Sequence, residues 1–204
     1  MIIKTIKVGE LKTNCYIVAS KDTRDAVIID PGGEPEKIIE AIETDKLKPI
    51  LIINTHVHPD HVSANSALAE KYGIVAALGE HGLILMKLYK DYFEEFSGLK
   101  LEDLRIEKLL YDGEIIHVGD IELKVIATPG HSKGSICLYA GRSLFSGDTL
   151  FAGTYGRTDT PGGSEREILA SIAKLMSLPD DTNVYPGHGA PTTIGDERYL
   201  YAKN

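Results

Sequence analysis

Three histidines and an aspartate fall within six consecutive positions of segment 54–61, which reads N-T-H-V-H-P-D-H. The segment follows an Ile-rich apolar run at 49–53, which is typical of a strand buried on both faces. Side chains two positions apart point the same way in an extended chain, so His56, His58 and Asp60 can converge. Imidazole and carboxylate are the standard ligands of catalytic zinc and of non-haem iron. The segment therefore predicts a metal site.

Three further turns each present one potential ligand at the end of an expected strand. They carry His131 in T-P-G-H-S, Asp148 in F-S-G-D-T and His188 in Y-P-G-H-G. A lone polar residue on such a turn is more often solvated than a ligand. However, five of the seven histidines lie at strand ends of this kind, together with two acidic residues. The exceptions, His81 and His117, are interpreted as structural.

Periodicity and chain breakers indicate strands alternating with helices in two similar runs. We expect strands at 2–8, 14–19, 26–30, 49–55, 74–78, 114–118, 121–127, 135–139, 143–146 and 182–185, and helices at 34–46, 62–72, 80–96, 164–177 and 197–202. The helix at 80–96 would present an apolar face that includes Tyr89, Tyr92, Phe93 and Phe96. This pattern predicts an α/β sandwich, with two sheets face to face and the helices outside.

Composition is that of an ordinary globular domain. The 204 residues suit a single domain spanning 1–204, with 43% hydrophobic and 25% charged residues. A formal charge of −8 argues against a general nucleic-acid or anionic-membrane surface. No apolar run approaches the ~20 residues that span a bilayer. Cys15 and Cys137 lie in strand-like apolar runs, so we expect buried thiols and a cytoplasmic protein, while a disulfide between them stays open.

The four motifs together resemble the metallo-β-lactamase-fold superfamily. They are T-H-V-H-P-D-H at 55–61, T-P-G-H-S-K-G-S at 128–135, S-G-D-T at 146–149 and P-G-H-G at 186–189, in the order typical of that superfamily. Segment 145–163, F-S-G-D-T-L-F-A-G-T-Y-G-R-T-D-T-P-G-G, is similar to the short glyoxalase II-like branch, the relatives of hydroxyacylglutathione hydrolase. The resemblance implies a four-layer αβ/βα sandwich of two mixed sheets, with a dinuclear metal site at one edge.

The resemblance also implies a role for each motif residue. His56, His58 and His131 would hold one divalent ion, and Asp148 would bridge it to a second. The second ion would also be held by Asp60, His61 and His188. Zinc is the expected metal, with iron or manganese as alternatives that the same ligands accept. Asp60 is in addition a candidate proton relay, and Thr55 and Thr128 are candidates for orienting the ligands.

The expected substrate is a small-molecule thioester, and the expected reaction is hydrolysis of the S-2-hydroxyacylglutathione type. Full-length glyoxalase II relatives carry a C-terminal helical region that binds glutathione, whereas here only residues 189–204 follow the last expected ligand, His188. Cations that could bind the carboxylates of a peptide thioester are Lys133, Arg142 and Arg157, and Tyr155 could line the pocket.

Other functions of the fold remain open. A persulfide dioxygenase would use one iron held by His56, His131 and Asp148, and shares the G-R-T-D stretch at 156–159. A lactonase or β-lactamase would use the same two ions on a different substrate. A nucleic-acid processing enzyme is disfavoured by the acidic charge. A binding module without catalysis is disfavoured because every ligand is present.

Overall fold

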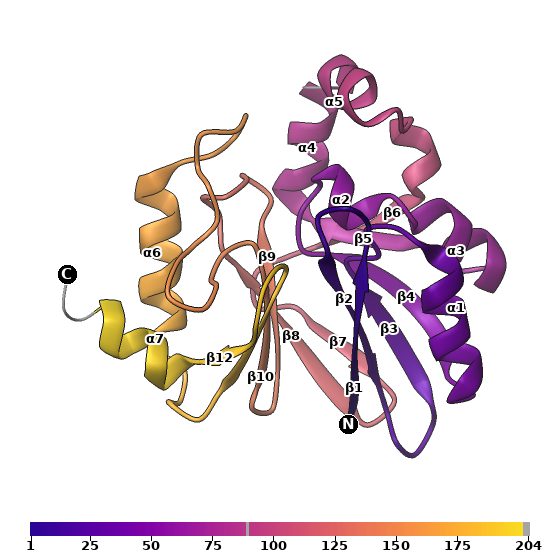
Figure 1. The fold of residues 1–204 in the computed structure, drawn as a ribbon, viewed down its shortest axis with the longest axis horizontal. Coiled ribbons are helices and arrows are strands. Elements are labelled where there is room, and N and C mark those ends of the chain that lie inside the picture. The colour runs from indigo at the N-terminus through magenta and orange to yellow at the C-terminus, as the bar shows by residue number, and fades with distance from the viewer. Residues whose placement is uncertain (89, 202–204) are drawn as a thin grey trace.

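The described residues form two six-stranded mixed sheets (Figure 1). This computed structural model describes residues 1–88 and 90–201, without the side chains of residues 85, 92, 93, 96, 101, 102, 200 and 201. The first sheet, in spatial order, is β1 (Ile2–Val8), β2 (Thr13–Ala19), β3 (Asp25–Ile29), β4 (Lys48–Asn54), β5 (Ala76–Gly79) and β6 (Ile106–Leu110). The second is β12 (Thr192–Thr193), β11 (Asn183–Pro186), β10 (Ser143–Gly147), β9 (Ile136–Ala140), β8 (Ile121–Ala127) and β7 (Ile115–Val118).

The helices cover the outer faces of both sheets (Figure 1). On the first sheet lie α1 (Pro35–Thr44) and α3 (Asn65–Tyr72), and on the second lie α6 (Glu165–Leu175) and α7 (Ile194–Tyr201). Between α1 and α3 comes the one-turn α2 (Pro59–Val62), while α4 (Glu80–Leu88), α5 (Lys90–Ser97) and the 3₁₀ turn η1 (Leu101–Leu104) connect β5 to β6. Among the described residues, no helix is both long and apolar enough to cross a bilayer.

Three apolar clusters separate these four layers. The inner faces of the two sheets meet in a cluster that includes Ile29, Ile53, Val125 and Phe145. A second cluster packs α1 and α3 against the first sheet, and a third packs α6 and α7 against the second sheet. β2 is buried along its whole length, as a strand covered on both sides must be. The predicted αβ/βα sandwich is confirmed.

The local predictions needed four corrections. The helix expected at 62–72 is two helices, since the chain breaks at Ala64, whose backbone N–H bonds to the carbonyl of Pro31. The helix expected at 80–96 is also two, α4 and α5; of its apolar face, the side chains of Tyr89, Tyr92, Phe93 and Phe96 lie outside the described residues. The strands β6 and β12 were missed. β6 is an edge strand whose second and third residues are Glu107 and Lys108, so it lacks the apolar run of a central strand.

Strand direction brings the polar segments to one edge of the sandwich. β3 and β4 are parallel, so the residues after each strand lie at the same edge. β2 is antiparallel to β3, which places the turn before β2 there too. In the second sheet β10 and β11 are parallel, and β8 points the same way because it is separated from β10 by the antiparallel β9. The segments that follow β4, β8, β10 and β11, including the short helix α2, carry all the predicted ligands.

Candidate metal centre

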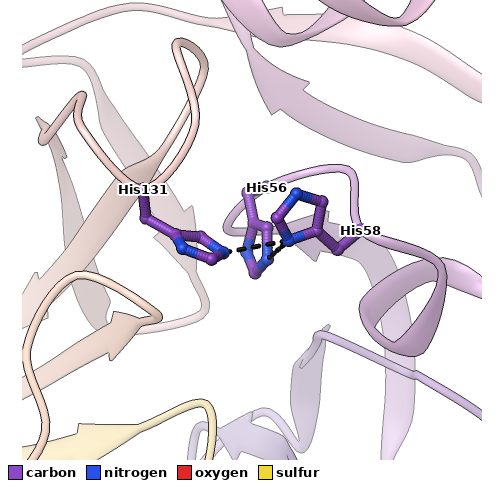
Figure 2. A group of neighbouring side chains, drawn as sticks. All are labelled: His56, His58 and His131. Carbon is purple, nitrogen blue, oxygen red and sulfur yellow. Dashed lines mark hydrogen bonds between the residues drawn. The ribbon is translucent and has the colours of Figure 1, made fainter. Parts of the chain in front are cut away.

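Three histidines from both sheets converge at this edge. His56 and His58 follow β4, and His131 follows β8 (Figure 2). His58 Nδ1 lies 3.1 Å from His56 Nε2 and 2.9 Å from His131 Nε2. Their three nitrogen atoms lie close enough together for one metal ion to contact all of them.

A second group forms beside the first. α2 begins at Pro59, whose fixed φ suits a first helical turn, and the turn carries Asp60 and His61. His188 arrives from the loop after β11. His188 Nε2 is 3.2 Å from Asp60 Oδ2, and His61 Nε2 is 3.4 Å from the same oxygen and 3.3 Å from His188 Nε2. This group could also hold one ion.

The carboxylate of Asp148 lies between the two groups. Its Oδ2 is 3.6 Å from His131 Nε2 in the first group and 3.6 Å from His188 Nε2 in the second. Its Oδ1 lies 3.5 Å from His61 Nε2 and is buried without a hydrogen-bond partner among the described residues. A buried carboxylate oxygen without a partner is costly, and it indicates a ligand at this position.

These separations fit metal coordination. Two ligand atoms at about 2.0–2.1 Å from one tetrahedral ion are about 3.3–3.4 Å apart. The distances of 2.9–3.6 Å among the ring nitrogens and carboxylate oxygens lie around this value. Gly187 leaves the space open, because a Cβ there would lie 2.2 Å from Asp148 Oδ1 and 2.8 Å from His61 Cε1. The donor set therefore suits divalent ions.

Hydrogen bonds to backbone carbonyls orient the rings of His131 and His188 so that Nε2 of each faces the centre. His131 Nδ1 lies 2.7 Å from the carbonyl oxygen of Arg157, and His188 Nδ1 lies 3.2 Å from that of Leu11. A carbonyl oxygen only accepts, so both Nδ1 atoms carry a hydrogen, and Nε2 is the atom of each ring that is available to a metal ion. Such partners fix the tautomer and orientation of metal-binding histidines.

Asp30, a residue that sequence reasoning missed, orients two more histidines. Its Oδ1 accepts from the backbone N–H of Thr55 and its Oδ2 from the Thr55 hydroxyl, both at 2.7 Å. Because that hydroxyl donates to Asp30, it accepts from His56 Nδ1 at 3.1 Å. His61 Nδ1 lies 3.0 Å from Asp30 Oδ2, at ion-pair distance, although not with the angle of a hydrogen bond. Asp30 thus holds ligands of both groups.

Asp30 is buried and has an uncommon backbone conformation. It is 1% exposed, and its φ of +51° lies in the left-handed region that few side chains adopt. Its position directly after a strand, at the same edge as the histidines, is the signal that could have found it.

Burial and neighbouring charges divide the histidines into two kinds. Burial, followed by repulsion from nearby histidines, lowers the pKa of His56 well below its usual range and that of His58 to about 3. Burial also lowers the pKa of His131. These three rings are therefore neutral at pH 7, the form that binds metal.

The second group is more strongly affected by carboxylates. Burial alone would lower the pKa of His61, but Asp148 and Asp30 raise it to about 9. The hydrogen bond with Asp60 raises the pKa of His188. Burial alone would raise the pKa of Asp60, but His188 and His61 bring it below its usual range. The site without metal thus concentrates negative charge that a cation would neutralise.

The other predicted residues lie at varied distances from this centre. Thr55 contacts His56 as expected, whereas Thr128 bonds to Thr149 and Cys137. The backbone of Arg157 contacts His131, while its guanidinium is exposed and paired with Asp159 at 2.7 Å. Lys133 follows His131 by two positions and is exposed.

The remaining residues singled out in the sequence have different outcomes. Arg142 is not at the site: it precedes β10, at the end opposite Asp148, and pairs with Asp181. Tyr155 packs against the apolar cluster under α6, and its hydroxyl lies 3.4 Å from Glu165. His81 and His117 are exposed and belong to neither ligand group. Cys15 and Cys137 are buried free thiols.

Comparison with known proteins agrees with this geometry. The sequence profile of the metallo-beta-lactamase superfamily matches residues 8–188. The hydroxyacylglutathione hydrolase GloC of Haemophilus influenzae is 34% identical over 203 residues, covering 97% of this chain and 95% of that protein. The chain belongs to the metallo-β-lactamase superfamily.

Two solved structures share the whole fold. TTHA1623, solved in a di-iron-bound form, has 36% identity and a TM-score of 0.84, and the match covers 97% of this chain and 98% of that one. BLEG-1, described as a B3 metallo-beta-lactamase, has 33% identity and a TM-score of 0.84, with 98% and 99% covered. Family membership and the converging His and Asp side chains support a metal-dependent hydrolase acting on a small molecule.

Proposed function

We propose that this protein hydrolyses thioesters of the S-2-hydroxyacylglutathione type at a dinuclear metal site. The observation that carries the proposal is the position of Asp148, whose carboxylate faces both ligand groups at 3.5–3.6 Å. A hydrolase with one ion would have no need of a second complete group on the far side of this carboxylate.

The proposed ligand sets follow the two groups. His56, His58 and His131 would hold the first ion, Asp60, His61 and His188 would hold the second, and Asp148 would contribute to both. Zinc is the proposed metal, and the di-iron form of TTHA1623 makes iron the main alternative. Two such ions would supply a bound water of lowered pKa and would polarise the carbonyl group of the substrate.

The chain itself offers no competing cysteine nucleophile among the described residues. Burial raises the pKa of Cys137 to about 11 and that of Cys15 well above its usual range, so neither thiol ionises at pH 7. Asp60 is the proposed proton relay during turnover, because its carboxylate lies beside His61 and His188 and its side chain is about one quarter exposed.

Substrate recognition is proposed to involve the positive charges beside the first group. Lys133 follows His131 by two positions, and the backbone carbonyl of Arg157 accepts a hydrogen bond from His131 Nδ1. Both residues are exposed. Charged groups there would favour a substrate that ends in carboxylates, as glutathione does. The similarity to GloC, a hydroxyacylglutathione hydrolase by name, supports this class of thioester. Tyr155 is a weaker candidate because it packs under α6.

The test is metal content and substrate range measured on one preparation. We expect close to two ions per chain, hydrolysis of S-lactoylglutathione, and loss of that hydrolysis on chelation with recovery on adding Zn²⁺. One iron per chain with oxygen uptake on glutathione persulfide would instead indicate the dioxygenase. Turnover of a β-lactam or a lactone without thioester hydrolysis would assign the site to another hydrolase of the fold.

A further inference from the structure

The turn between β1 and β2 contacts the second ligand group. Residues 9–12 form this turn, and Thr13 begins β2 opposite Val8. The hydroxyl of Thr13 donates to Asp60 Oδ2 at 3.0 Å, and the carbonyl of Leu11 accepts from His188 Nδ1 at 3.2 Å. Two of the three side chains of this group are therefore held by one short stretch of chain.

Thr13 bonds to the oxygen of Asp60 that faces the other two residues of the second group. Asp60 Oδ2 is the atom that lies 3.2 Å from His188 Nε2 and 3.4 Å from His61 Nε2. Thr13 is completely buried, whereas the side chain of Asp60 is 24% exposed. A buried hydroxyl on a rigid strand can thus restrain a carboxylate that is otherwise partly free to rotate.

The same strand is fastened to the loop that carries His188. The Asn14 amide donates to the carbonyls of Pro186 and Gly189 at 2.9 and 3.1 Å, and the Tyr16 hydroxyl donates to Pro186 at 2.6 Å. Asn14 N also donates to Gly187 at 2.7 Å. These bonds set the position of Thr13 relative to His188 across the two sheets.

The first ligand group depends on other elements. His131 is oriented by the carbonyl of Arg157, and His56 by Thr55 and Asp30. Asp30 also reaches His61, so it serves both groups. Among the described residues, the only predicted ligand to which the Thr13 hydroxyl bonds is Asp60 of the second group.

We propose that Thr13 is a positioning residue that sets the affinity of the second metal subsite and leaves the first unchanged. The inference rests on the proposed function, since it assumes that Asp60, His61 and His188 hold an ion. Removal of the hydroxyl frees Asp60 to turn toward solvent, and loss of such an outer contact typically costs 10- to 100-fold in metal affinity.

The experiment is a calorimetric Zn²⁺ titration of the metal-free protein, with folding checked by circular dichroism. In Thr13→Val one of the two binding steps should lose about 10- to 100-fold in affinity while the other changes less than about threefold. Thr13→Ala must behave in the same way, because it lacks the hydroxyl without placing a methyl group against Asp60. Thr13→Ser keeps the hydroxyl and should give the same isotherm as the wild type.

Thr128→Val is the matched control. Thr128 is also a fully buried threonine at a strand end, but it bonds to Thr149 and Cys137 rather than to a ligand. Its isotherm should match that of the wild type. Unchanged binding in both Thr13→Val and Thr13→Ala, or an equal loss in both steps, would overturn the inference alone. A wild-type chain that binds fewer than two ions would overturn the proposed function as well.

Discussion

Replacement of Asp30 by asparagine tests whether one buried carboxylate organises the metal centre. Asn has the same shape and is also tolerated in the left-handed region, so the φ of +51° is kept and only the carboxylate chemistry changes. The carboxylate now accepts two bonds from Thr55 at 2.7 Å and lies 3.0 Å from His61 Nδ1. An amide offers a single oxygen to these three donors.

Both orientations of the amide carry a cost. If its NH₂ replaces Oδ1, the backbone N–H of Thr55 faces another donor, and an unpaired buried donor costs about 1–3 kcal/mol. If its NH₂ replaces Oδ2, the Thr55 hydroxyl must reverse, and His61 Nδ1 faces an amide NH₂ group in place of a carboxylate oxygen. His61 can then carry its hydrogen on Nε2, the atom that faces Asp60 and His188, where it blocks metal binding.

Two measurements on Asp30→Asn separate these outcomes. Urea unfolding of the metal-free protein should show a loss of about 1–3 kcal/mol, or Zn²⁺ titration should show a loss of about 10- to 100-fold in affinity. Asp45→Asn is the control, because Asp45 pairs with Lys4 in a partly exposed position and such pairs contribute about 0–1 kcal/mol. Stability and metal affinity both equal to wild type would refute the role assigned to Asp30.

Three further predictions concern the ligands directly. His58→Ala should remove thioesterase activity and most bound metal while the circular dichroism spectrum stays native. Asp148→Ala should lose more metal, because Asp148 contacts both ligand groups. Full turnover by either variant would contradict the assignment of these residues as metal ligands. Gly187→Ala should lower the metal content, since the added Cβ would lie 2.2 Å from Asp148 Oδ1. Elemental analysis measures this content, and a metal content equal to that of the wild type would contradict the prediction. In the metal-free protein, the pKa of His58 is lowered to about 3 and that of His61 is raised to about 9. The His58 contribution to stability is present above the ordinary pKa of about 6.5 and is lost as pH falls toward 3, whereas the His61 contribution is present below about 6.5 and is lost as pH rises through 9. Urea midpoints should therefore be highest near neutral pH, and a flat profile would contradict these shifts.

Much of the fold follows from local patterns. Continuous apolar runs such as that of β4, and breakers such as Gly73, whose φ of +64° ends α3, are properties of neighbouring residues. Elements that depend on distant contacts escaped prediction. β6 exists because it pairs with β5 across the helical connection, and β12 because it pairs with β11.

The sequence alone determined which side chains could bind metal. Motif spacing identified His56, His58, Asp60, His61, His131, Asp148 and His188, because i and i+2 periodicity and strand-end turns are encoded locally. Only the tertiary structure decided which partners orient them. Asp30, Thr13 and the carbonyls of Leu11 and Arg157 lie up to 177 positions from the ligands they contact. No periodicity links residues so far apart; the strand directions of two packed sheets bring them to one edge.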